Sequence, residues 1–405
     1  YYETRYEDSV LGQGNATSSV GATQGSTWVY EDEVTYPFGY GLSYTTFEQK
    51  LTNVSVSVGG EGIATVTVKN TGDVAGKSVV QLYVQAPYIQ GGVEKSAIQL
   101  IGYGKTGVLE PGASETVTVS FDPQYMASYD DSNGGAWILD AGDYYFAIGN
   151  GAHEALNNVL ALKTGSTENL VSTTEEDVID EACAFKWSLS SKDETTYSEN
   201  VENQLQFADI NTQIPGTVEY TTRSDWTVGW ETVDLLTPTD EMMVGLTNSR
   251  YELTVNGDGE TWGVDHDLTL IDLVTIEDGQ IVSVASLDDP LWDQLLEEIT
   301  LDEAIQFIEK GGDDIENIDS ILLPRLYEND GPLGFTYDQV GGYYVRWTKS
   351  DSSRPTYVEK DDDYATWADN VMPTEPVVAA TFNDELVIRE GELQGEAALW
   401  TKETG

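Results

Sequence analysis

Residues 36–47 read YPFGYGLSYTTF, and they mark the point where an open, glycine-rich segment gives way to strand patterning. Aromatic rings are interspersed here with two glycines and a proline, a composition that suits a rigid connector packing its rings against two neighbours. From Ser43 the composition is already that of a strand. We therefore predict an inter-domain hinge, with β structure after it.

Residues 45–164 carry short alternating stretches separated by turn signals. TVTV occurs at both 65–68 and 116–119. A period of two is typical of strands with one buried face. Turn-forming sequences, such as NTGD at 70–73 and EPG at 110–112, separate the strands. The pattern predicts a two-layer sandwich of seven or eight strands with an immunoglobulin-like topology.

The composition excludes several classes of partner. The chain has 405 residues, of which 40% are hydrophobic and 10% aromatic, enough for real cores. Its formal net charge is −52, from 71 acidic and 19 basic residues. A polyanion gains nothing from counterion release at a phosphate backbone, so nucleic acid and anionic membranes are excluded as partners. Neutral sugars remain compatible.

The chain holds one cysteine and two histidines. We interpret Cys183, which is flanked by alanines, as a small buried hydrophobe rather than a reactive thiol. His153 and His266 lie in different segments, which argues against a two-histidine metal site and favours turn or surface roles. Residues 256–267 alternate oxygen ligands, but Thr261 stands where a calcium loop of the EF-hand type needs glycine. We therefore assign no metal-binding residue and leave open whether the acidic segment binds calcium.

Neither a membrane span nor a signal peptide is visible. No apolar run approaches the roughly twenty residues that a transmembrane helix needs. The chain begins at Tyr1 without an initiator methionine and resembles the middle of a longer polypeptide. An extracellular or cell-surface location is favoured slightly over a cytoplasmic one, and the oligomeric state is left open.

Residues 166–286 form a strongly acidic segment. A charge run is usually a solvated face, but tryptophans and other aromatic residues are too frequent here for a purely disordered tether. Residues 177–185 are compatible with a helix. We interpret the segment as an extended linker that folds partly on its neighbours.

From about residue 287 the signals become helical. Asp289 followed by Pro290 is typical of a helix start, and apolar residues then recur on one stripe. Thr300, with Glu303 three residues later, forms a capping-box sequence that predicts a second helix. Asn383 is placed to cap a last helix that continues to the end of the chain.

Three stretches resemble glycoside hydrolase family 3, the β-glucosidase family. Residues 36–47 resemble the segment that joins the family's α/β sandwich domain to its fibronectin III-like domain. NTGDVAGKSVVQLYV at 70–84 resembles the central hairpin of that domain, and DGPLG at 330–334 resembles the first substrate loop of the family's barrel. The barrel motif here follows the fibronectin-like domain, so the resemblance is to the domain-inverted branch of the family.

The resemblance implies an internal fragment that is mainly β with some α. Four parts are expected. They are the C-terminal tail of the α/β sandwich domain (1–44), an immunoglobulin/fibronectin III-like β-sandwich (45–165), an acidic, partly ordered linker (166–286), and the first helices and strand of a TIM-barrel-type domain (287–405).

Asp330 is the candidate substrate-binding residue. ILLP at 321–324 predicts a strand, and the DGP turn at 330–332 would place a carboxylate at its C-terminal end, where barrels build their sites. A carboxylate can accept hydrogen bonds from two sugar hydroxyls. Taken alone, Asp-Gly-Pro is ordinary turn chemistry. The resemblance implies that the aspartate binds hydroxyls of the non-reducing terminal glucosyl unit.

No catalytic residue is assigned within this chain. Retaining glycosidases use a nucleophile and an acid/base carboxylate about 5 Å apart, and spacing alone selects no pair among so many acidic residues. The resemblance implies a nucleophile aspartate beyond Gly405 and an acid/base residue before Tyr1. Neither family motif occurs in the sequence, so we expect the 405-residue chain by itself to be inactive.

The function that the resemblance implies is part of an exo-acting retaining β-glycosidase in carbohydrate catabolism. The whole protein would hydrolyse terminal non-reducing β-D-glycosyl residues of oligosaccharides, or aryl β-glycosides, without a cofactor. Its other partners would be the remaining sandwich and barrel domains of the parent chain. The alternative is a non-catalytic carbohydrate-binding or cell-surface β-sandwich protein, which the fibronectin-like domain alone permits. The choice among gluco, xylo and arabino sugars stays open.

Overall fold

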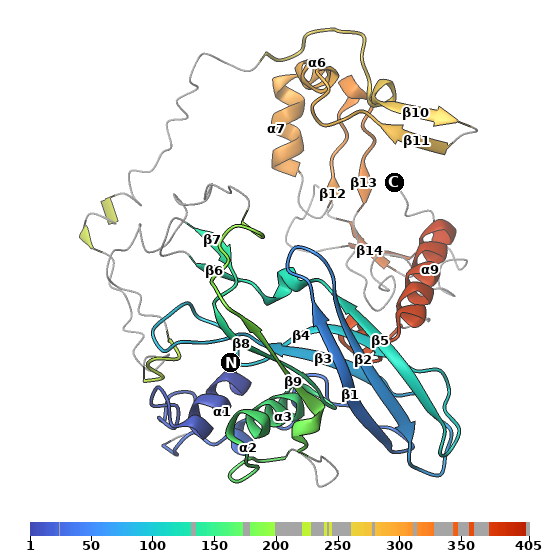
Figure 1. Cartoon of the computed structure of the whole chain (residues 1–405). Coiled ribbons are helices and arrows are strands. Elements are labelled where there is room, and N and C mark those ends of the chain that lie inside the picture. The colour runs from blue at the N-terminus through green and yellow to red at the C-terminus, as the bar shows by residue number, and fades with distance from the viewer. Residues whose placement is uncertain are drawn as a thin grey trace. The chain divides into compact units, whose positions relative to one another are not determined.

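The structure is a computed structural model that falls into two compact units, residues 1–237 and 238–405 (Figure 1). The residues that it describes are 1–23, 25–130, 135–172, 179–198, 221–227, 239–240, 243–244, 261–277, 280–310, 314–327, 343–346, 356–359 and 372–401. Within these ranges, no helix is long and apolar enough to cross a bilayer.

Two antiparallel sheets form the sandwich of the first unit (Figure 1). The three-stranded sheet has the order β1-β2-β5, with β1 at Phe47–Val56, β2 at Gly62–Asn70 and β5 at Ser114–Phe121. The four-stranded sheet has the order β4-β3-β8-β9, with β4 at Gln99–Lys105, β3 at Val79–Gln85, β8 at Gly142–Ile148 and β9 at Ala184–Leu189. A 3-10 turn, η1 (Pro123–Met126), precedes a small hairpin of β6 (Ser128–Asp130) and β7 (Ala136–Ile138). The predicted fibronectin III-like β-sandwich is confirmed.

The core between the sheets follows the predicted period of two. Ala64, Val66 and Val68 of β2 are fully buried, while the threonines between them are half-buried. They belong to the same buried cluster as Leu82 of β3 and Phe146 of β8. Burying one such large apolar side chain stabilises the fold by about 1.5–3 kcal/mol, so this shared interior is what joins the two sheets.

A helix follows β8, and this differs from the sequence-based expectation. The whole stretch 45–164 was predicted to consist of strands and turns, but α3 (Ala152–Thr164) is helical, and the strand that pairs with β8 on its far side from β3 is β9. Leu156 and Val159 of α3 pack against the outer face of the sheet, on Tyr83 of β3 and Ala147 of β8. Apolar residues at helical spacing thus cover the second face of a sheet whose strand β3 is buried on both sides.

The acidic segment contributes to the sandwich, as its partial folding on neighbours predicted. The possible helix at 177–185 is wrong, because the described residues there form a 3-10 turn, η2 (Glu181–Cys183), and then the start of β9. β9 pairs with β8 from Ala147 opposite Ala184 to Gly142 opposite Leu189. The sandwich therefore takes in residues beyond the expected boundary at 165.

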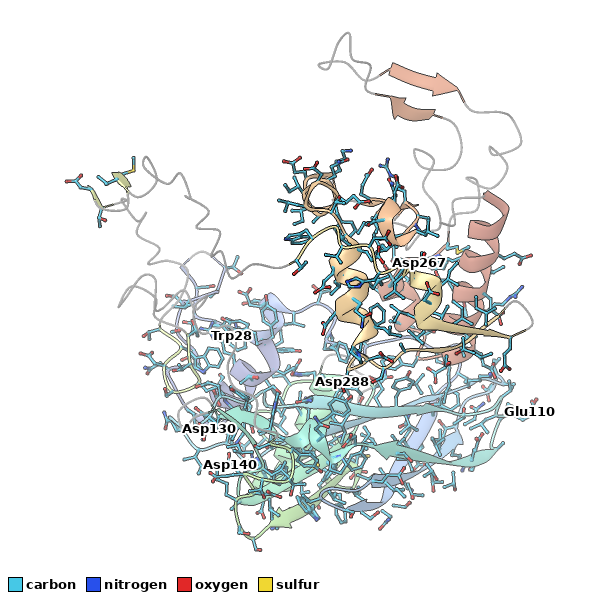
Figure 2. The ribbon with its side chains drawn as sticks, turned by 90° about the horizontal axis from the view of Figure 1, so that it is seen from above. Trp28, Glu110, Asp130, Asp140, Asp267 and Asp288 are labelled. Atoms are coloured by element: carbon cyan, nitrogen blue, oxygen red, sulfur yellow. The ribbon has the colours of Figure 1, made fainter. Side chains whose placement is uncertain are left out.

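The N-terminal residues pack on α3 and the outer sheet face. They form α1 (Tyr2–Leu11) and a single turn, α2 (Tyr30–Glu33). The Tyr6 hydroxyl donates to Asn157 Oδ1 at 2.9 Å, and Trp28 is 2% exposed. Figure 2 places Trp28 among these helices and Glu110 at the opposite end of the sandwich, in the turn before β5. The residues expected to be a domain tail (1–44) thus cover a continuous apolar surface of the first unit.

The hinge at 36–47 is held by its backbone. Gln81 Nε2 donates to the Gly39 carbonyl at 2.9 Å, and the Ala152 amide donates to the Phe38 carbonyl at 2.8 Å. Gly39 has φ of +83°, which favours glycine, and a Cβ there would lie 2.1 Å from Gln81 Oε1. The rings were predicted to pack on two neighbours, but most stay exposed in the first unit: Tyr36 is 72% exposed, Phe38 63% and Tyr44 99%.

The second unit is built from short elements. They are η5 (Leu270–Leu273), the hairpin of β10 (Val274–Glu277) and β11 (Gln280–Val284), α6 (Leu291–Glu298), α7 (Leu301–Lys310), η6 (Asp319–Ile321), the paired β12 (Asp314–Ile315) and β13 (Leu326–Tyr327), the paired β14 (Tyr343–Arg346) and β15 (Thr356–Glu359), α8 (Glu375–Ala379) and α9 (Asp384–Thr401). Its buried cluster consists of Leu273, Leu295, Ile299, Ile318 and Ile321.

The predicted helices of the second unit are confirmed. Asp289 Oδ1 accepts from the Leu291 amide at 3.0 Å at the start of α6. The capping box before α7 is complete, since Thr300 Oγ1 accepts from the Glu303 amide at 3.2 Å and Glu303 Oε2 accepts from the Thr300 amide at 2.9 Å. α9 begins directly after Asn383.

The predicted strand at 321–324 is wrong. The backbone turns there through η6, and Leu322 adopts a left-handed conformation with φ of +57°. The turn is closed by an isolated bridge in which the amides of Ile318 and Leu323 each donate to the other's carbonyl at 3.0 Å. A run of four apolar residues does not distinguish a strand from a buried turn, because both structures can bury such residues.

Candidate functional site

Asp330, the predicted substrate-binding residue, lies outside the described residues. The described chain leads toward it through β13, which ends at Tyr327 and pairs antiparallel with β12. The placement of its carboxylate at the end of a barrel strand therefore stays a prediction. What the structure supplies is the framework that holds the chain just before it.

That framework is fixed by α6 and α7. Glu303 of α7 reaches the neighbouring turn, where its Oε1 accepts from the Ser320 amide at 2.9 Å. Ile318 and Ile321 from the same turn join Leu295 and Ile299 in the buried cluster. Burial alone would raise the pKa of Glu303, but hydrogen bonds from Thr300 and Ser320 outweigh it and lower the pKa to about 2. Glu303 is therefore a structural carboxylate that ties α7 to residues 318–321.

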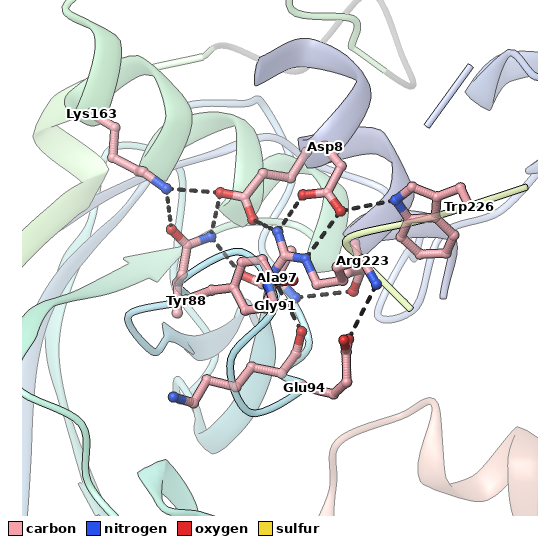
Figure 3. Close-up of polar contacts among 12 residues, drawn as sticks. Asp8, Tyr88, Gly91, Glu94, Ala97, Lys163, Arg223 and Trp226 are labelled. Carbon is pink, nitrogen blue, oxygen red and sulfur yellow. Dashed lines mark hydrogen bonds and ion pairs between the residues drawn. The ribbon is translucent and has the colours of Figure 1, made fainter. Parts of the chain in front are cut away.

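A second group of polar residues is fully described and lies in the first unit (Figure 3). We call it the Arg223 cluster, and it consists of Glu7 and Asp8 from α1, Gln85 from β3, Lys163 from α3, and Arg223 and Trp226 from residues 221–227. Four separate parts of the chain meet there. Both carboxylates are buried, at 3% and 0% side-chain exposure.

Every charge in the Arg223 cluster has a partner. Arg223 donates to Asp8 from Nη2 at 2.5 Å and from Nε at 3.1 Å, and to Glu7 Oε2 from Nη2 at 2.9 Å. Lys163 Nζ donates to Glu7 Oε1 at 2.8 Å. Burial acts to lower the pKa of Arg223, but the hydrogen bonds and charges of Asp8 and Glu7 outweigh it and raise the pKa. The guanidinium also lies 4.1 Å from the centre of the Tyr88 ring.

This geometry does not suit glycosidase chemistry. A nucleophile carboxylate and an acid/base carboxylate must face a sugar across open space about 5 Å wide. The oxygens of Glu7 and Asp8 are instead occupied by hydrogen bonds and ion pairs with Arg223 and Lys163. The cluster is an internal ion-pair network.

Sequence reasoning missed the Arg223 cluster, although a signal was present. Arg223 is a rare basic residue in a strongly acidic stretch, and Trp226 follows three residues later. A cation and a large aromatic ring that close together are costly to bury without matching groups. Nothing in the sequence, however, identifies Glu7 and Asp8 among 71 acidic residues as those groups.

A pocket of about 220 Å³ lies beside the Arg223 cluster. Its lining combines paired charges with two aromatic rings, from Tyr88 and Tyr145. Asp143 at its edge accepts from Ser188 Oγ at 2.5 Å and from Lys186 Nζ at 3.3 Å, and these two hydrogen bonds lower the pKa of its carboxyl. The pocket is large enough for a small polar molecule, but its charged walls are already neutralised.

His153 is not in the turn or surface role that was predicted. It lies at the start of α3 and is fully buried, stacked on Tyr30 with ring centres 4.1 Å apart. Its Nδ1 is 2.8 Å from Glu3 Oε2, and its Nε2 donates to the Val171 carbonyl at 2.7 Å. The packing of α1 on α3 buries this position, and that contact could not be read from local sequence.

The remaining candidates have structural surroundings. His266 is half-buried in a loop, and its Nε2 is 2.7 Å from Glu297 Oε2. Cys183 packs against the sandwich core, and burial raises the pKa of its thiol to about 12. A thiol with so high a pKa is a poor nucleophile, which agrees with the predicted hydrophobic role.

Comparisons with known proteins agree with the fold. A family model described as a fibronectin type III-like domain matches residues 78–152, the region from β3 to the start of α3. Beta-glucosidase A of Butyrivibrio fibrisolvens is 43% identical over 136 residues, which are 29% of this chain and 16% of that protein. The beta-glucosidase of Ruminococcus albus is 43% identical over 129 residues, 31% of this chain and 13% of that protein. The chain thus spans only a small part of these relatives.

Among solved structures, beta-glucosidase 3B from Thermotoga neapolitana, in complex with α-D-glucose, is 30% identical, with a TM-score of 0.29 over 39% of this chain and 18% of that one. The β-glucosidase from Kluyveromyces marxianus, in complex with glucose, is 28% identical, with a TM-score of 0.30 over 40% and 16%. Together with the motifs at 36–47 and 70–84, the matched domain and the curated relatives support the interpretation of the chain as a fragment of a protein similar to glycoside hydrolase family 3.

Proposed function

We propose that the protein of which this chain is part is an exo-acting retaining β-glycosidase that hydrolyses terminal non-reducing β-D-glycosyl residues of oligosaccharides. The observation that supports it is the 43% identity to β-glucosidases of two bacteria over a region of this chain. The reaction needs two carboxylates and a water molecule and no cofactor. The chemistry would take place in domains that this chain does not supply in full.

Residues 287–405 are the start of the catalytic barrel in this proposal. The DGPLG sequence at 330–334 supports it, because a carboxylate after a strand can bind two hydroxyls of a terminal sugar. α6, α7 and the turn at 318–323 would anchor this loop, since they bury the cluster of Leu273, Leu295, Ile299, Ile318 and Ile321 immediately before it. Asp330 would then orient the sugar, and residues elsewhere in the parent protein would perform the bond cleavage.

The sandwich has a supporting role in this proposal. Several of its described carboxylates, those of Glu7, Asp8 and Asp143, form ion pairs with lysine or arginine side chains. The exposed rings of residues 36–44 are suited to contact the remaining domains of the parent protein. A location outside the cell or at its surface is part of the proposal, and fractionation of cells that express the parent protein would test it.

The test is an activity assay of the whole protein encoded by the parent reading frame. We expect release of single glycosyl units from oligosaccharides and aryl β-glycosides, with the β-anomer formed first, as followed by NMR. Parallel gluco, xylo and arabino substrates identify the sugar. The purified 405-residue chain should be inactive, because both catalytic carboxylates are expected elsewhere and their loss removes several orders of magnitude in rate.

Two outcomes would contradict the proposal. A folded parent protein that binds oligosaccharides but cleaves none of these substrates would favour the non-catalytic alternative. Turnover by the 405-residue chain that survives removal of contaminating glucosidase would mean that the catalytic pair lies within it.

A further inference from the structure

Residues 221–227 form a short turn that lies against the body of the first unit. The Asp225 amide donates to the Thr222 carbonyl at 3.1 Å, and Asp225 Oδ1 accepts from the Thr227 amide at 2.9 Å. Such side-chain and backbone hydrogen bonds hold a turn in shape by themselves. The residues on both sides of it, 199–220 and 228–238, are not among those described. The turn is thus a local structure whose main contacts are with residues distant in sequence.

Two side chains of the turn serve as anchors. Arg223 and Trp226 are each 4% exposed, although they belong to a strongly acidic and mostly polar stretch. Figure 3 shows both pointing at Asp8 of α1, with the Arg223 backbone facing Glu94. A large aromatic ring and an arginine are the side chains that most often dominate the energy of protein interfaces.

Asp8 gives the surface beneath the anchors a carboxylate that pairs with both of them. Its side chain is completely buried, and the hydrogen bonds that the described structure gives its carboxylate all come from Arg223 and Trp226, the latter from Nε1 at 3.0 Å. A buried carboxylate is strongly unfavourable without a cation, and here the cation is 215 residues away in sequence. Among the described residues, the turn alone supplies the partners of this charge on α1.

Glu7 is also held by groups outside the turn. Its Oε1 accepts from Lys163 Nζ at 2.8 Å and from Gln85 Nε2 at 3.0 Å, both parts of the sandwich and its covering helix. Its other oxygen, Oε2, is left to accept from Arg223. This division of the two oxygens is expected of a preorganised site, in which the binding side chain is already fixed.

Gly14 allows the backbones to approach. The Trp226 amide donates to the Gly14 carbonyl at 3.0 Å, and a Cβ at Gly14 would lie 2.0 Å from the Arg223 carbonyl oxygen. Gly14 also has φ of +59°. A side chain at this position would displace the turn without altering any charge. Glu7, Asp8, Gly14 and Tyr88 together form what we call the docking surface.

We propose that the docking surface recognises the Arg-Ser-Asp-Trp turn as a linear peptide motif, and that it binds the same peptide when it is supplied from outside the chain. The ligand class is a peptide with an arginine and a tryptophan three residues apart. In the intact chain the docked turn ties the acidic segment to the first unit. This proposal does not depend on the proposed enzymatic function.

The first experiment uses the full chain with Arg223→Ala and Trp226→Ala, so that its own turn cannot dock. A fluorescein-labelled peptide of residues 219–229, EYTTRSDWTVG, is titrated and followed by anisotropy. We expect saturable binding to the double variant and at least tenfold weaker apparent binding to the wild-type chain, whose own turn occupies the surface. The peptide with Arg223→Glu should not bind.

Matched controls separate specific docking from attraction to an acidic protein. Asp8→Asn or Gly14→Ala, added to the double variant, should weaken peptide binding at least tenfold. Glu61→Gln, which removes an acid from an exposed turn of the sandwich, should leave it unchanged. Equal loss from Glu61→Gln, or no binding to a double variant whose circular dichroism spectrum shows that it is folded, would overturn the proposal.

A second measurement decides the matter if the double variant does not fold. In the full chain with Arg223→Lys, which keeps the charge but loses the paired geometry, hydrogen exchange is followed along the sequence. Faster exchange confined to residues 221–227 and α1, with β2 and β5 unchanged, is expected of a separable docked motif. Faster exchange spread through β2 and β5 would mean that the turn is part of the sandwich fold, and would overturn the proposal.

Discussion

The two units of the chain differ in how completely they bury their apolar side chains. In the first unit, two clusters fill the interior of the sandwich and the space under α1 and α3. In the described part of the second unit, a single cluster of five buried residues holds the helices and turns together. On α7, Leu301 is 53% exposed and Ile308 is 78% exposed. Among the described residues, the sandwich has a complete buried interior, whereas α7 of the second unit exposes apolar side chains.

This difference indicates which unit is expected to need the rest of the parent protein for its stability. A domain with a complete interior can fold by itself, while a partial one needs further elements to cover its exposed faces. Exposed apolar helix faces are expected if residues 287–405 are the beginning of a barrel. The two units should therefore unfold in separate transitions, with the sandwich the more stable.

The largest effect is expected from Phe146→Ala in β8. Its ring is fully buried between the sheets, with its centre 5.4 Å from that of Phe121. Removing it leaves a cavity and should lower the free energy of unfolding of the first unit by about 3–5 kcal/mol. Urea unfolding followed by circular dichroism should show the sandwich transition at lower urea and the second transition unmoved. A shift of both transitions together would mean that the units fold as one.

Leu295→Ala in α6 is the converse test. Leu295 is 1% exposed, but several of its neighbours, such as Trp292 and Leu291, are only partly buried. The structure around it can therefore relax, and we expect a loss of about 2–3 kcal/mol, the low end for such a substitution. The loss should appear only in the second transition. Destabilisation of the sandwich by this variant would contradict the division into two units.

Gly39→Ala tests the backbone contact of the hinge. The new methyl group would meet the buried ends of Gln81 and Tyr83, and φ at this position is +83°. Both effects should lower the stability of the first unit by about 1–3 kcal/mol. Gly41→Ala is the matched control, because no atom lies within 4 Å of its Cβ and its φ is not positive, so its melting temperature should not change.

The smallest effect is expected from Thr300→Ala at the start of α7. The substitution removes the hydroxyl that accepts from the Glu303 amide, and a lost cap of this kind costs about 1 kcal/mol. Thermal unfolding of the second unit would measure it. Thr300→Ser, which keeps the hydroxyl, should restore most of the stability, and an equal loss in Thr300→Ser would refute the capping role.

The lowered pKa of Glu303 also predicts how the stability of the second unit depends on pH. Its pKa is lowered from 4.5 to about 2 in the folded state, so the folded state favours the carboxylate. Its stabilising contribution is present above pH 4.5 and is lost as the pH falls from about 4.5 to about 2. Glu303→Gln should reduce this pH dependence, as measured by urea unfolding between pH 2 and pH 6, and unchanged pH dependence would exclude Glu303 as its source.

Periodic patterns were read from the sequence with success. The alternating valines and threonines of β2 and β5, and the Thr300 and Glu303 capping box, encode their structure within a few residues. The predicted elements were wrong where contacts with residues distant in sequence determine the local structure. At 152–164 a helix forms in place of strands, and it covers the outer face of β3 and β8. At 318–323 a turn forms in place of a strand, and its Ile318 and Ile321 are buried with Leu295 and Ile299.

The polar sites could be predicted far less well, for the same reason. His153 and Asp8 are buried only because α1 packs against parts of the chain more than 100 residues away. No local signal distinguishes these residues from the many exposed acids or from a surface histidine. Asp330 could be singled out because its turn resembles a family motif, and its role depends on the whole barrel.

The most direct test of the account is the kinetics of Asp330 variants in the whole parent protein. Two hydrogen bonds to a charged group contribute about 1.5–3 kcal/mol each, so Asp330→Ala should reduce kcat/KM on a β-glucoside by roughly two to four powers of ten. Asp330→Asn should recover only part of that loss, with the melting temperature nearly unchanged in both. Near wild-type kinetics in Asp330→Ala on both a β-glucoside and a β-xyloside would contradict the account. The account would also be contradicted if Asp330→Ala lost both stability and activity and Asp330→Asn restored both.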